Sequence, residues 1–257
     1  MLLAIDIGNS NVVVGLWLEG QWVYSFRLES NQSYEPRDVE MHIRDFFLEH
    51  DIHLNEIKRS VLCSVVPALT PIVQAALERL LGTKPLMVGP SLYGRLAIHV
   101  NNPAEMGADL VANASAAYDH FKATCLVVDF GTALTVTTVG AEGHILGVAI
   151  APGIQTAMKA LAGNTAKLPE IPLKVPTSVL GKNTIHAMQA GILLGYEGLV
   201  KALVSKTEAE IGQPAMKLAT GGLAHTMVGL SDYFDAIMPT LTLDGLIVID
   251  RQFRAKS

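Results

Sequence analysis

Two short segments of the chain place an aspartate, a glycine and small polar residues in the same order. They are DIGNSN from Asp6 and DFGTALT from Asp129, and each follows an apolar run. The glycine permits a tight turn that exposes backbone N–H groups to an anion, and the small polar side chains can donate to phosphate oxygens. The carboxylate can hold a cation that bridges phosphates. The pattern indicates a site for nucleotide phosphates and a cation.

The surroundings of the two segments repeat as well. Three strands joined by tight turns are predicted around the first segment, in LLAIDIG, NSNVVVGLWL and QWVYSFRLES. Three more are predicted in the same way around the second segment, in TCLVVDFG, TALTVTTVG and HILGVAIAPG. Each set is followed by helical and strand-like stretches. We therefore predict an α/β protein of two duplicated domains, 1–117 and 118–257, each a three-stranded meander extended by parallel strands, with a cleft between them. Coincidence is the alternative, since hairpins with Asp-x-Gly are common.

A further glycine pair, Gly221 and Gly222, ends the strand-like run MKLAT and precedes an expected helix. Such a turn lets the backbone approach a nucleotide closely. The sequence lacks a Walker A loop, a GxGxxG after a strand, a GxSxG elbow and an HExxH helix. The sequence therefore does not favour four classes of protein: P-loop ATPases, Rossmann oxidoreductases, serine hydrolases with a GxSxG elbow, and zincins.

Asp109 is the third acidic residue of interest, in NNPAEMGADLVANAS. We expect Glu105, Asp109 and Asn113 to share one face of a helix because they are four residues apart. Near the domain junction, the Asp109 carboxylate could orient an acceptor hydroxyl and accept its proton. The alternative is a first-turn aspartate that the helix dipole favours.

Composition narrows the class of protein. Half of the residues are apolar, 17% are charged and the net charge is −5, which is typical of a globular protein and gives no general attraction to nucleic acid or anionic lipid. Asp6 interrupts the first apolar run, and we expect neither a signal peptide nor a membrane span. Cys63 and Cys125 sit in apolar runs and are expected to be reduced and buried. Trp17 and Trp22 flank a turn and are expected to pack across strands.

The motifs together resemble the type III pantothenate kinases, over nearly the whole chain. After DIGNSN and DFGTALT, the similar segments in order are NPAEMGADLVAN, GVAIAPG, NTAKLP, GKNTIHAMQAG and LATGGLA. The resemblance implies two ribonuclease H-like domains of the actin-like ATPase fold. It also implies a cytoplasmic homodimer that uses ATP to phosphorylate pantothenate to 4′-phosphopantothenate, the first step of coenzyme A biosynthesis, with no nucleic-acid or membrane partner.

The resemblance also assigns roles to residues. Asp109 is the implied catalytic base, and Asp6 and Asp129 are implied to hold Mg²⁺ and a monovalent cation, K⁺ or NH₄⁺. Thr184 is implied to contact pantothenate across the dimer interface. The implied pantothenate pocket is lined by Gly107, Ala108, Asp109 and Leu110. The implied contacts to ATP are Asp6, Ile7, Gly8, Asn9, Ser10, Asn11, Val12, Val13 and Thr132, to which the glycine argument adds Gly221 and Gly222.

The sequence departs from the family pattern at Leu110, where the family has an arginine. A leucine cannot supply the charged, bidentate donor that an arginine offers on the pantothenate side. Arg95 and Lys122 are the nearby cations in sequence. The departure leaves two alternatives to an active pantothenate kinase: a kinase of this fold with another small hydroxyl acceptor, and a non-catalytic nucleotide-binding regulator.

Overall fold

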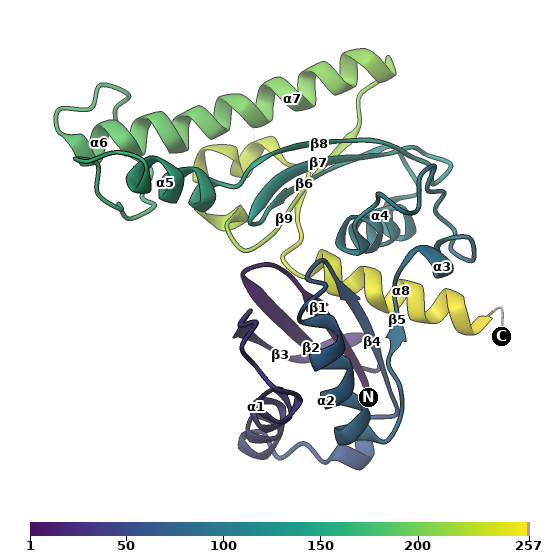
Figure 1. Cartoon of the computed structure of the whole chain (residues 1–257). Helices are drawn as coiled ribbons and strands as arrows, with labels where there is room; N and C mark the ends of the chain where they lie inside the picture. Colours follow the sequence, from purple (N-terminus) through teal and green to yellow (C-terminus); the bar gives the residue numbers. More distant parts are fainter. Residues whose placement is uncertain (256–257) are drawn as a thin grey trace. The chain divides into compact units, whose positions relative to one another are not determined.

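The computed structural model describes residues 1–255, which form two compact units (Figure 1). The first unit contains Met1–Ala116 and the segment from Thr242 onward, and the second contains Ala117–Leu241. The sequence placed the C-terminal segment with the second domain. Its side chains pack instead within the first unit, as described below.

The first unit is built on a five-stranded sheet in the order β3-β2-β1-β4-β5. The β1–β2 and β2–β3 pairs are antiparallel, whereas β4 is parallel to β1 and β5 is parallel to β4. The strands are β1 (Leu2–Ile7), β2 (Asn11–Leu18), β3 (Gln21–Glu29), β4 (Arg59–Ser64) and β5 (Leu86–Met87).

The second unit repeats this topology, with the order β8-β7-β6-β9-β10 when it is read from the equivalent edge. β6, β7 and β8 form an antiparallel meander, and β9 and β10 extend it in parallel. The strands are β6 (Cys125–Phe130), β7 (Ala133–Val139), β8 (Ile145–Pro152), β9 (Met216–Thr220) and β10 (Ala236–Ile237). The predicted duplication is confirmed, although β10 is too short to have been recognised.

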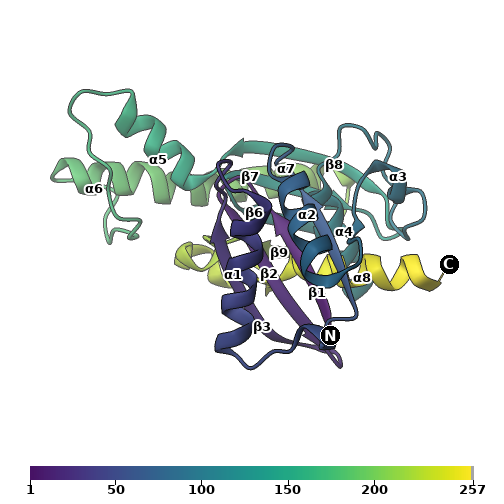
Figure 2. The same ribbon diagram turned by 60° about the horizontal axis from the view of Figure 1, so that its bottom comes forward.

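Two helices cover one face of the first sheet, as Figure 2 shows. They are α1 (Pro36–Glu49), which begins with a capping box between Glu35 and Asp38, and α2 (Thr70–Leu81), which ends at the left-handed Gly82. Alternate strand residues such as Leu3, Ile5 and Leu62 pack against the apolar sides of both helices. Because side chains alternate along a strand, Ala4, Asp6 and Cys63 point to the opposite face.

The C-terminal helix α8 (Leu241–Ala255) packs on that opposite face. Gly15 allows its close approach, because a side chain there would meet Trp22 and Leu243. Trp22 also donates its indole N–H to Asp244 of α8, at 2.6 Å. Trp22 forms the expected cross-strand pair with Trp17, with ring centroids 4.9 Å apart.

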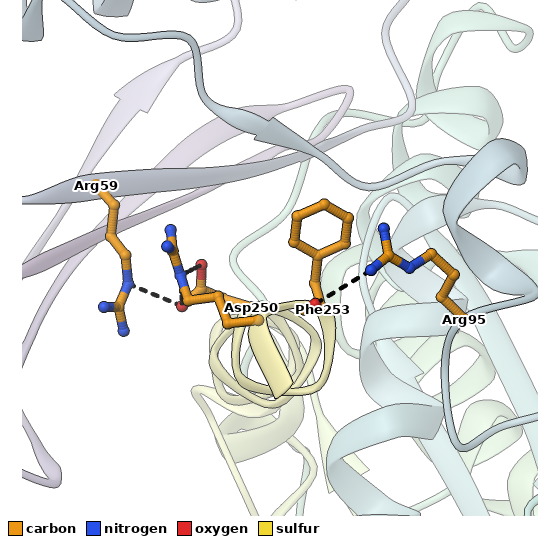
Figure 3. A network of polar contacts seen from close by, with 5 residues as sticks. Arg59, Arg95, Asp250 and Phe253 are labelled. Carbon is orange, nitrogen blue, oxygen red and sulfur yellow. Dashed lines mark hydrogen bonds and ion pairs between the residues drawn. The ribbon is translucent and has the colours of Figure 1, made fainter. Parts of the chain in front are cut away.

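A buried carboxylate fastens the far end of α8 (Figure 3). Asp250 is only 1% exposed and accepts from the Nε atoms of Arg59 on β4, at 2.8 Å, and Arg254, at 3.0 Å. Arg95 lies over the Phe253 ring, 4.2 Å from its centroid, and donates to the Phe253 carbonyl. Thus ion pairs as well as apolar packing hold α8 to the first unit.

The remaining helices complete both units. In the first unit they are the 3₁₀ turn Leu54–Glu56, α3 (Pro90–Tyr93) and most of α4 (Ala108–Phe121), which crosses the boundary between the units. The second unit contains α5 (Ile154–Gly163), α6 (Thr184–Gln189), a π-helical turn (Ala190–Leu194), α7 (Gly195–Ile211) and two 3₁₀ turns (Ala224–Thr226 and Val228–Tyr233). Buried residues of α5 and α7, including Met158, Val200 and Val204, pack on Leu126 and Val128 of its sheet.

The continuous helix Thr184–Ile211 satisfies length and composition criteria for a membrane span, although no such stretch was expected from the sequence. Core helices of soluble proteins satisfy the same criteria. One third of its most apolar window is buried, and Tyr196, Val200 and Val204 face the core of the second unit.

Candidate active site

Asp6 lies at the C-terminal end of β1, on the sheet face opposite the α1 and α2 core. The chain then turns sharply: the N–H of Gly8 donates to the Asn11 carbonyl at 3.0 Å. Ser30, just beyond β3, donates its hydroxyl to the Gly8 carbonyl at 2.5 Å and its N–H to the Ser10 carbonyl at 3.1 Å. The first aspartate and its turn are therefore held by the ends of three strands.

The residues expected to contact ATP in this turn differ in exposure. Asn9, Ser10 and Asn11 are exposed, so their side chains are accessible to a ligand. Ile7 and Val12 are buried in the core beneath the turn, which leaves only their backbone groups for a contact. Their apolar side chains support the turn from below.

Cys63 lies beside Asp6, because β1 and β4 pair in parallel with these two residues opposite each other. The thiol donates to Oδ1 of Asp6 at 3.3 Å and is fully buried. Burial, followed by the negative charges of Asp6 and Asp109, raises the pKa of Cys63 well above its usual value. The thiol therefore stays protonated at neutral pH. Cys63 and Cys125 are both reduced and buried, as expected.

Asp109 lies in the first turn of α4, and its Oδ1 accepts from the N–H of Leu110 at 2.8 Å. Burial raises the pKa of this carboxyl, and hydrogen bonds from the Leu110 and Asp109 backbone N–H groups oppose the rise only in part. Gly107 leaves space for this arrangement, since a side chain there would meet the carboxylate. Asp109 is thus both a first-turn residue at a helix N-terminus and a desolvated carboxylate.

The expected helical face of Glu105, Asp109 and Asn113 is wrong. The α4 helix begins at Ala108, so Glu105 lies in the preceding turn, where its N–H donates to the Asn102 carbonyl. Asn113 is fully buried and accepts from the Thr242 hydroxyl of α8. Only Asp109 of the three belongs to the candidate site.

Tyr93 at the end of α3 is a residue that the sequence did not single out. Its hydroxyl donates to the Met106 carbonyl at 3.2 Å, just before Gly107 and α4. Burial, with smaller contributions from Cys63 and Asp109, raises the pKa of Tyr93 to about 12. Tyr93 and Cys63 are thus neutral groups within electrostatic reach of Asp109.

Leu110, the residue after Asp109, is buried and apolar. The two cations considered from the sequence are engaged elsewhere. Arg95 contacts Phe253, as shown above, and the Lys122 ammonium lies over the Tyr118 ring and 3.5 Å from Asp119.

In the second unit, Asp129 is the last residue but one of β6, just as Asp6 is of β1. Its cross-strand partners are Thr135 on β7 and Thr220 on β9. The Thr135 hydroxyl oxygen is buried and has no hydrogen-bond partner among the described residues. A carboxylate with an unsatisfied hydroxyl oxygen nearby is a donor set suited to a hard cation.

The turns around Asp129 pack tightly on one another. Gly153 donates its N–H to the Thr132 carbonyl at 3.0 Å, and a side chain at Gly153 would overlap that backbone. Gly221 has φ +91°, and a side chain there would overlap Asp129 and Phe130. Thr132 and Gly222 are exposed. The expected helix after the glycine pair is instead the first of the two 3₁₀ turns.

Thr184 begins α6 directly after its N-cap Asn183, whose side chain accepts from the His186 N–H at 2.9 Å. Gly181 permits the preceding loop to lie against Ala187. Thr184 is exposed, and so are the apolar side chains of Val179, Leu180 and Ile185. The surface around the start of α6 therefore contains the candidate ligand-binding residue Thr184 together with exposed apolar side chains.

Sequence reasoning counted Thr135 among the small polar residues that could donate to phosphate, but it missed Ser30 and Cys63 beside Asp6, Gly153 near Asp129 and Tyr93 near Asp109. For Cys63 and Thr220, the positions at which β4 and β9 end were a signal that the sequence analysis could have used. Parallel strands end at the same edge of a sheet, so Cys63 and Thr220 could have been placed beside the two aspartates once the strands were aligned.

Comparison with solved structures shows the fold. A candidate Baf family transcriptional activator from Campylobacter jejuni superposes with a TM-score of 0.61 at 20% identity, covering 98% of this chain and 99% of that one. A candidate 2-dehydro-3-deoxygalactonokinase from Sinorhizobium meliloti gives 0.58 at 12% identity, covering 99% and 96%. The chain has the actin-like ATPase fold, as the family resemblance implies.

Comparison with sequences shows the family. A curated type III pantothenate kinase from Moorella thermoacetica is 39% identical over 249 residues, covering 97% of this chain and 98% of that protein. Another, from Geobacter sp., is 36% identical over 252 residues, covering 98% and 99%. The family model for type III pantothenate kinases matches residues 2–206. The chain therefore belongs to the type III pantothenate kinase family.

Proposed function

We propose that this protein uses ATP to phosphorylate the primary hydroxyl of pantothenate, giving 4′-phosphopantothenate for coenzyme A biosynthesis. Family membership supports the reaction, and the desolvated Asp109 is the observation that connects it to this chain. A buried carboxylate with a raised pKa is a stronger base than an exposed one, which suits removal of a proton from an alcohol.

Asp109 is proposed to accept the proton of the pantothenate hydroxyl as its oxygen attacks the γ-phosphorus of ATP. A P–O bond to the acceptor forms, the bond to the β–γ bridging oxygen breaks, and ADP leaves. Most of the catalytic effect in phosphoryl transfer comes from positioning and charge stabilisation. Gly107 and Leu110 contribute to positioning, because Gly107 leaves space for the carboxylate and Leu110 donates its N–H to it.

Asp6 and the turn Gly8–Asn11 are proposed to bind the ATP phosphates together with Mg²⁺. The donor set fits this ion, because Mg²⁺ in phosphoryl-transfer sites usually takes one or two carboxylates and completes its shell with phosphates and water. Among residues 1–255, no group of three or more His, Cys, Asp or Glu could enclose a metal ion, so a fully protein-bound metal is not favoured. When bound, Mg²⁺ would neutralise charge on the phosphates.

Asp129 is proposed to hold a monovalent cation, K⁺ or NH₄⁺, in the second unit. The orphaned hydroxyl oxygen of Thr135 supports this assignment, since an oxygen ligand would be satisfied by a cation. Thr132, Gly221 and Gly222 are proposed to contact the nucleotide through groups near that aspartate. The cation would offset the negative charge that Asp129 adds near a phosphate.

Leu110, in the proposed pantothenate pocket, supports a second candidate function. Leu110 provides no charged donor for the pantothenate carboxylate, and this observation favours a same-fold kinase for a neutral hydroxyl acceptor. Pantothenol, in which an alcohol replaces the carboxylate, distinguishes the two. Preference for pantothenate in kcat/KM supports the proposed acceptor, whereas a preference of tenfold or more for pantothenol supports the alternative.

We also propose a cytoplasmic homodimer in which Thr184 contacts the partner's pantothenate. The exposed apolar side chains beside Thr184, at Val179, Leu180 and Ile185, support an interface there. Light scattering of the wild type and of Leu180→Glu measures the association. A monomeric Leu180→Glu variant with full activity would contradict the role of Thr184.

The deciding experiment is an ADP-release assay with pantothenate and Mg²⁺, with and without K⁺. We expect turnover that requires pantothenate and is increased by K⁺, and product of the mass of phosphopantothenate. Nucleotide binding without pantothenate-dependent turnover would reject the proposed acceptor while leaving the nucleotide assignment in place.

A further inference from the structure

The buried thiol of Cys63 has no part in the mechanism above, yet it contacts one of its residues. Cys63 donates to Oδ1 of Asp6 at 3.3 Å, across the parallel pairing of β4 and β1. The thiol is fully buried, so solvent does not compete for this hydrogen bond. A carboxylate that accepts a buried hydrogen bond loses rotational freedom, and its second oxygen keeps a defined direction.

The duplicated fold supplies an independent observation. In the second unit the residue opposite Asp129 on the parallel strand β9 is Thr220, which is 1% exposed. Cys63 and Thr220 thus occupy the same register position beside the aspartate of each unit. Both are short side chains with one proton to donate. At the two preceding positions both units have apolar residues instead: Leu62 is matched by Ala219, and Val61 by Leu218.

We propose that Cys63 is a positioning residue for nucleotide binding, whose thiol holds the Asp6 carboxylate in the orientation that receives the magnesium-bound phosphates. This inference rests on the proposed role of Asp6 and extends it to a residue that touches neither substrate nor metal. The alternative is a cysteine that only fills space in the core, as buried cysteines commonly do.

Two matched pairs of variants separate these roles. Cys63→Ser keeps a donor that Cys63→Ala lacks. Cys63→Thr introduces the side chain used in the second unit, and Cys63→Val has the same shape without the hydroxyl. Any cost of altered volume is similar within the second pair, so a difference between its members reports the donor. If one pair fails to fold, the other still gives the comparison.

The first readout is calorimetric binding of a non-hydrolysable ATP analogue with Mg²⁺, accompanied by kcat and the KM for pantothenate. We expect Cys63→Ala and Cys63→Val to weaken nucleotide binding or lower kcat by about 5- to 10-fold. This is the range for loss of one hydrogen bond between a weak donor and a charged acceptor. Ser and Thr should stay within about twofold of the wild type. The KM for pantothenate should not change. Equal behaviour of donor and non-donor variants would overturn the proposal.

The second readout is the frequency of the infrared S–H stretching band. If Cys63 only fills space, this frequency should not depend on Asp6. In a Cys125→Ala background Cys63 is the only thiol. We expect Asp6→Asn to move the band to higher frequency, because the charged acceptor is lost, and an unmoved band would contradict the hydrogen bond. Failure of the wild type to bind the Mg²⁺ nucleotide would reject this inference together with the role of Asp6. Failure to phosphorylate pantothenate with binding intact would reject the acceptor alone.

Discussion

At the scale of single residues, the properties of Asp109 come from a compromise between two effects. Its place in the first turn of α4 and the N–H of Leu110 favour the charged carboxylate, while burial disfavours it more strongly. The net effect is a raised pKa, so folding holds this carboxyl group in an environment that destabilises its charged form. Such a residue should show opposite effects on activity and stability when it is neutralised.

Asp109→Asn tests both effects. We expect kcat with pantothenate to fall by about 10²- to 10⁴-fold, as for loss of a general base, with nucleotide affinity unchanged. We also expect a higher Tm at neutral pH, because the amide removes the cost of burying a charge. Steady-state kinetics and thermal unfolding measure the two. A variant with nearly full kcat would exclude Asp109 as the base.

The pH dependence follows from the same shift. Asp109 must be ionised to accept a proton, so kcat/KM should fall as the pH drops through its pKa, and this limb should lie above the range of an ordinary aspartate. For stability the sign is opposite: the folded pKa exceeds the unfolded one, so stability decreases as the pH rises through the folded pKa. In Asp109→Asn this part of the pH dependence of Tm should vanish, which unfolding scans across pH would show.

The residue scale also shows what the sequence could supply. The aspartates, glycines and polar turn residues stand together in the chain, so local pattern singled out Asp6 and Asp129 as candidates, whereas the role expected of Asp109 came from the family resemblance. The Cys63–Asp6 hydrogen bond joins residues 57 positions apart and depends on strand register, which no local pattern records. Glu105 was misplaced because helical spacing alone does not show where α4 begins.

At the scale of elements, glycines decide how closely turns can pack around Asp129. Gly221 and Gly212 both have positive φ, +91° and +71°, but only Gly221 faces neighbouring atoms where a side chain would be. Gly212 ends α7 in open space. The two positions therefore separate the cost of the backbone conformation from the cost of overlap.

Gly221→Ala and its control Gly212→Ala form a matched test. We expect Gly212→Ala to lower the free energy of unfolding by about 1–2 kcal/mol, the cost of a left-handed alanine. Gly221→Ala should cost about 1–3 kcal/mol more, because its methyl group overlaps Asp129 and Phe130, and it should weaken activation by K⁺. Urea unfolding and K⁺ titrations measure these effects. Equal costs at both positions would show that the turn relaxes freely.

The ion pairs of α8 give a second test at this scale. Asp250 is buried between Arg59 and Arg254, whose side chains are almost half exposed. We expect Asp250→Asn to cost about 1–2 kcal/mol of unfolding free energy, reduced from the value for a fully buried pair by solvent screening. Arg44→Ala, which removes an i,i+4 pair on α1 and leaves Glu40 its second partner Arg79, should cost only about 0.3–0.5 kcal/mol. A cost for Asp250→Asn no greater than this would show that apolar packing alone fastens α8.

At the scale of the whole molecule, the duplication was visible because both halves repeat the same order of apolar runs and turns. The assignment of α8 was not visible, since nothing in LTLDGLIVIDRQFRA states which sheet it covers. The answer lies in long-range partners: Gly15 opens a space for Leu243, Trp22 binds Asp244 and Arg59 binds Asp250. The chain thus returns to its first unit after completing the second.

This return predicts that the first unit cannot fold without the C-terminal helix. A chain ending at Thr240 would expose the face of the first sheet around Gly15 and leave Asn113 and Trp22 without their partners on α8. We expect it to lose the near-ultraviolet signal of its tryptophans and to aggregate, while the second unit keeps its structure by hydrogen exchange. A synthetic peptide of residues 241–257 added in trans should restore the signal, whereas a scrambled peptide should not. A truncated chain with native tryptophan signal and full nucleotide binding would show that α8 is dispensable.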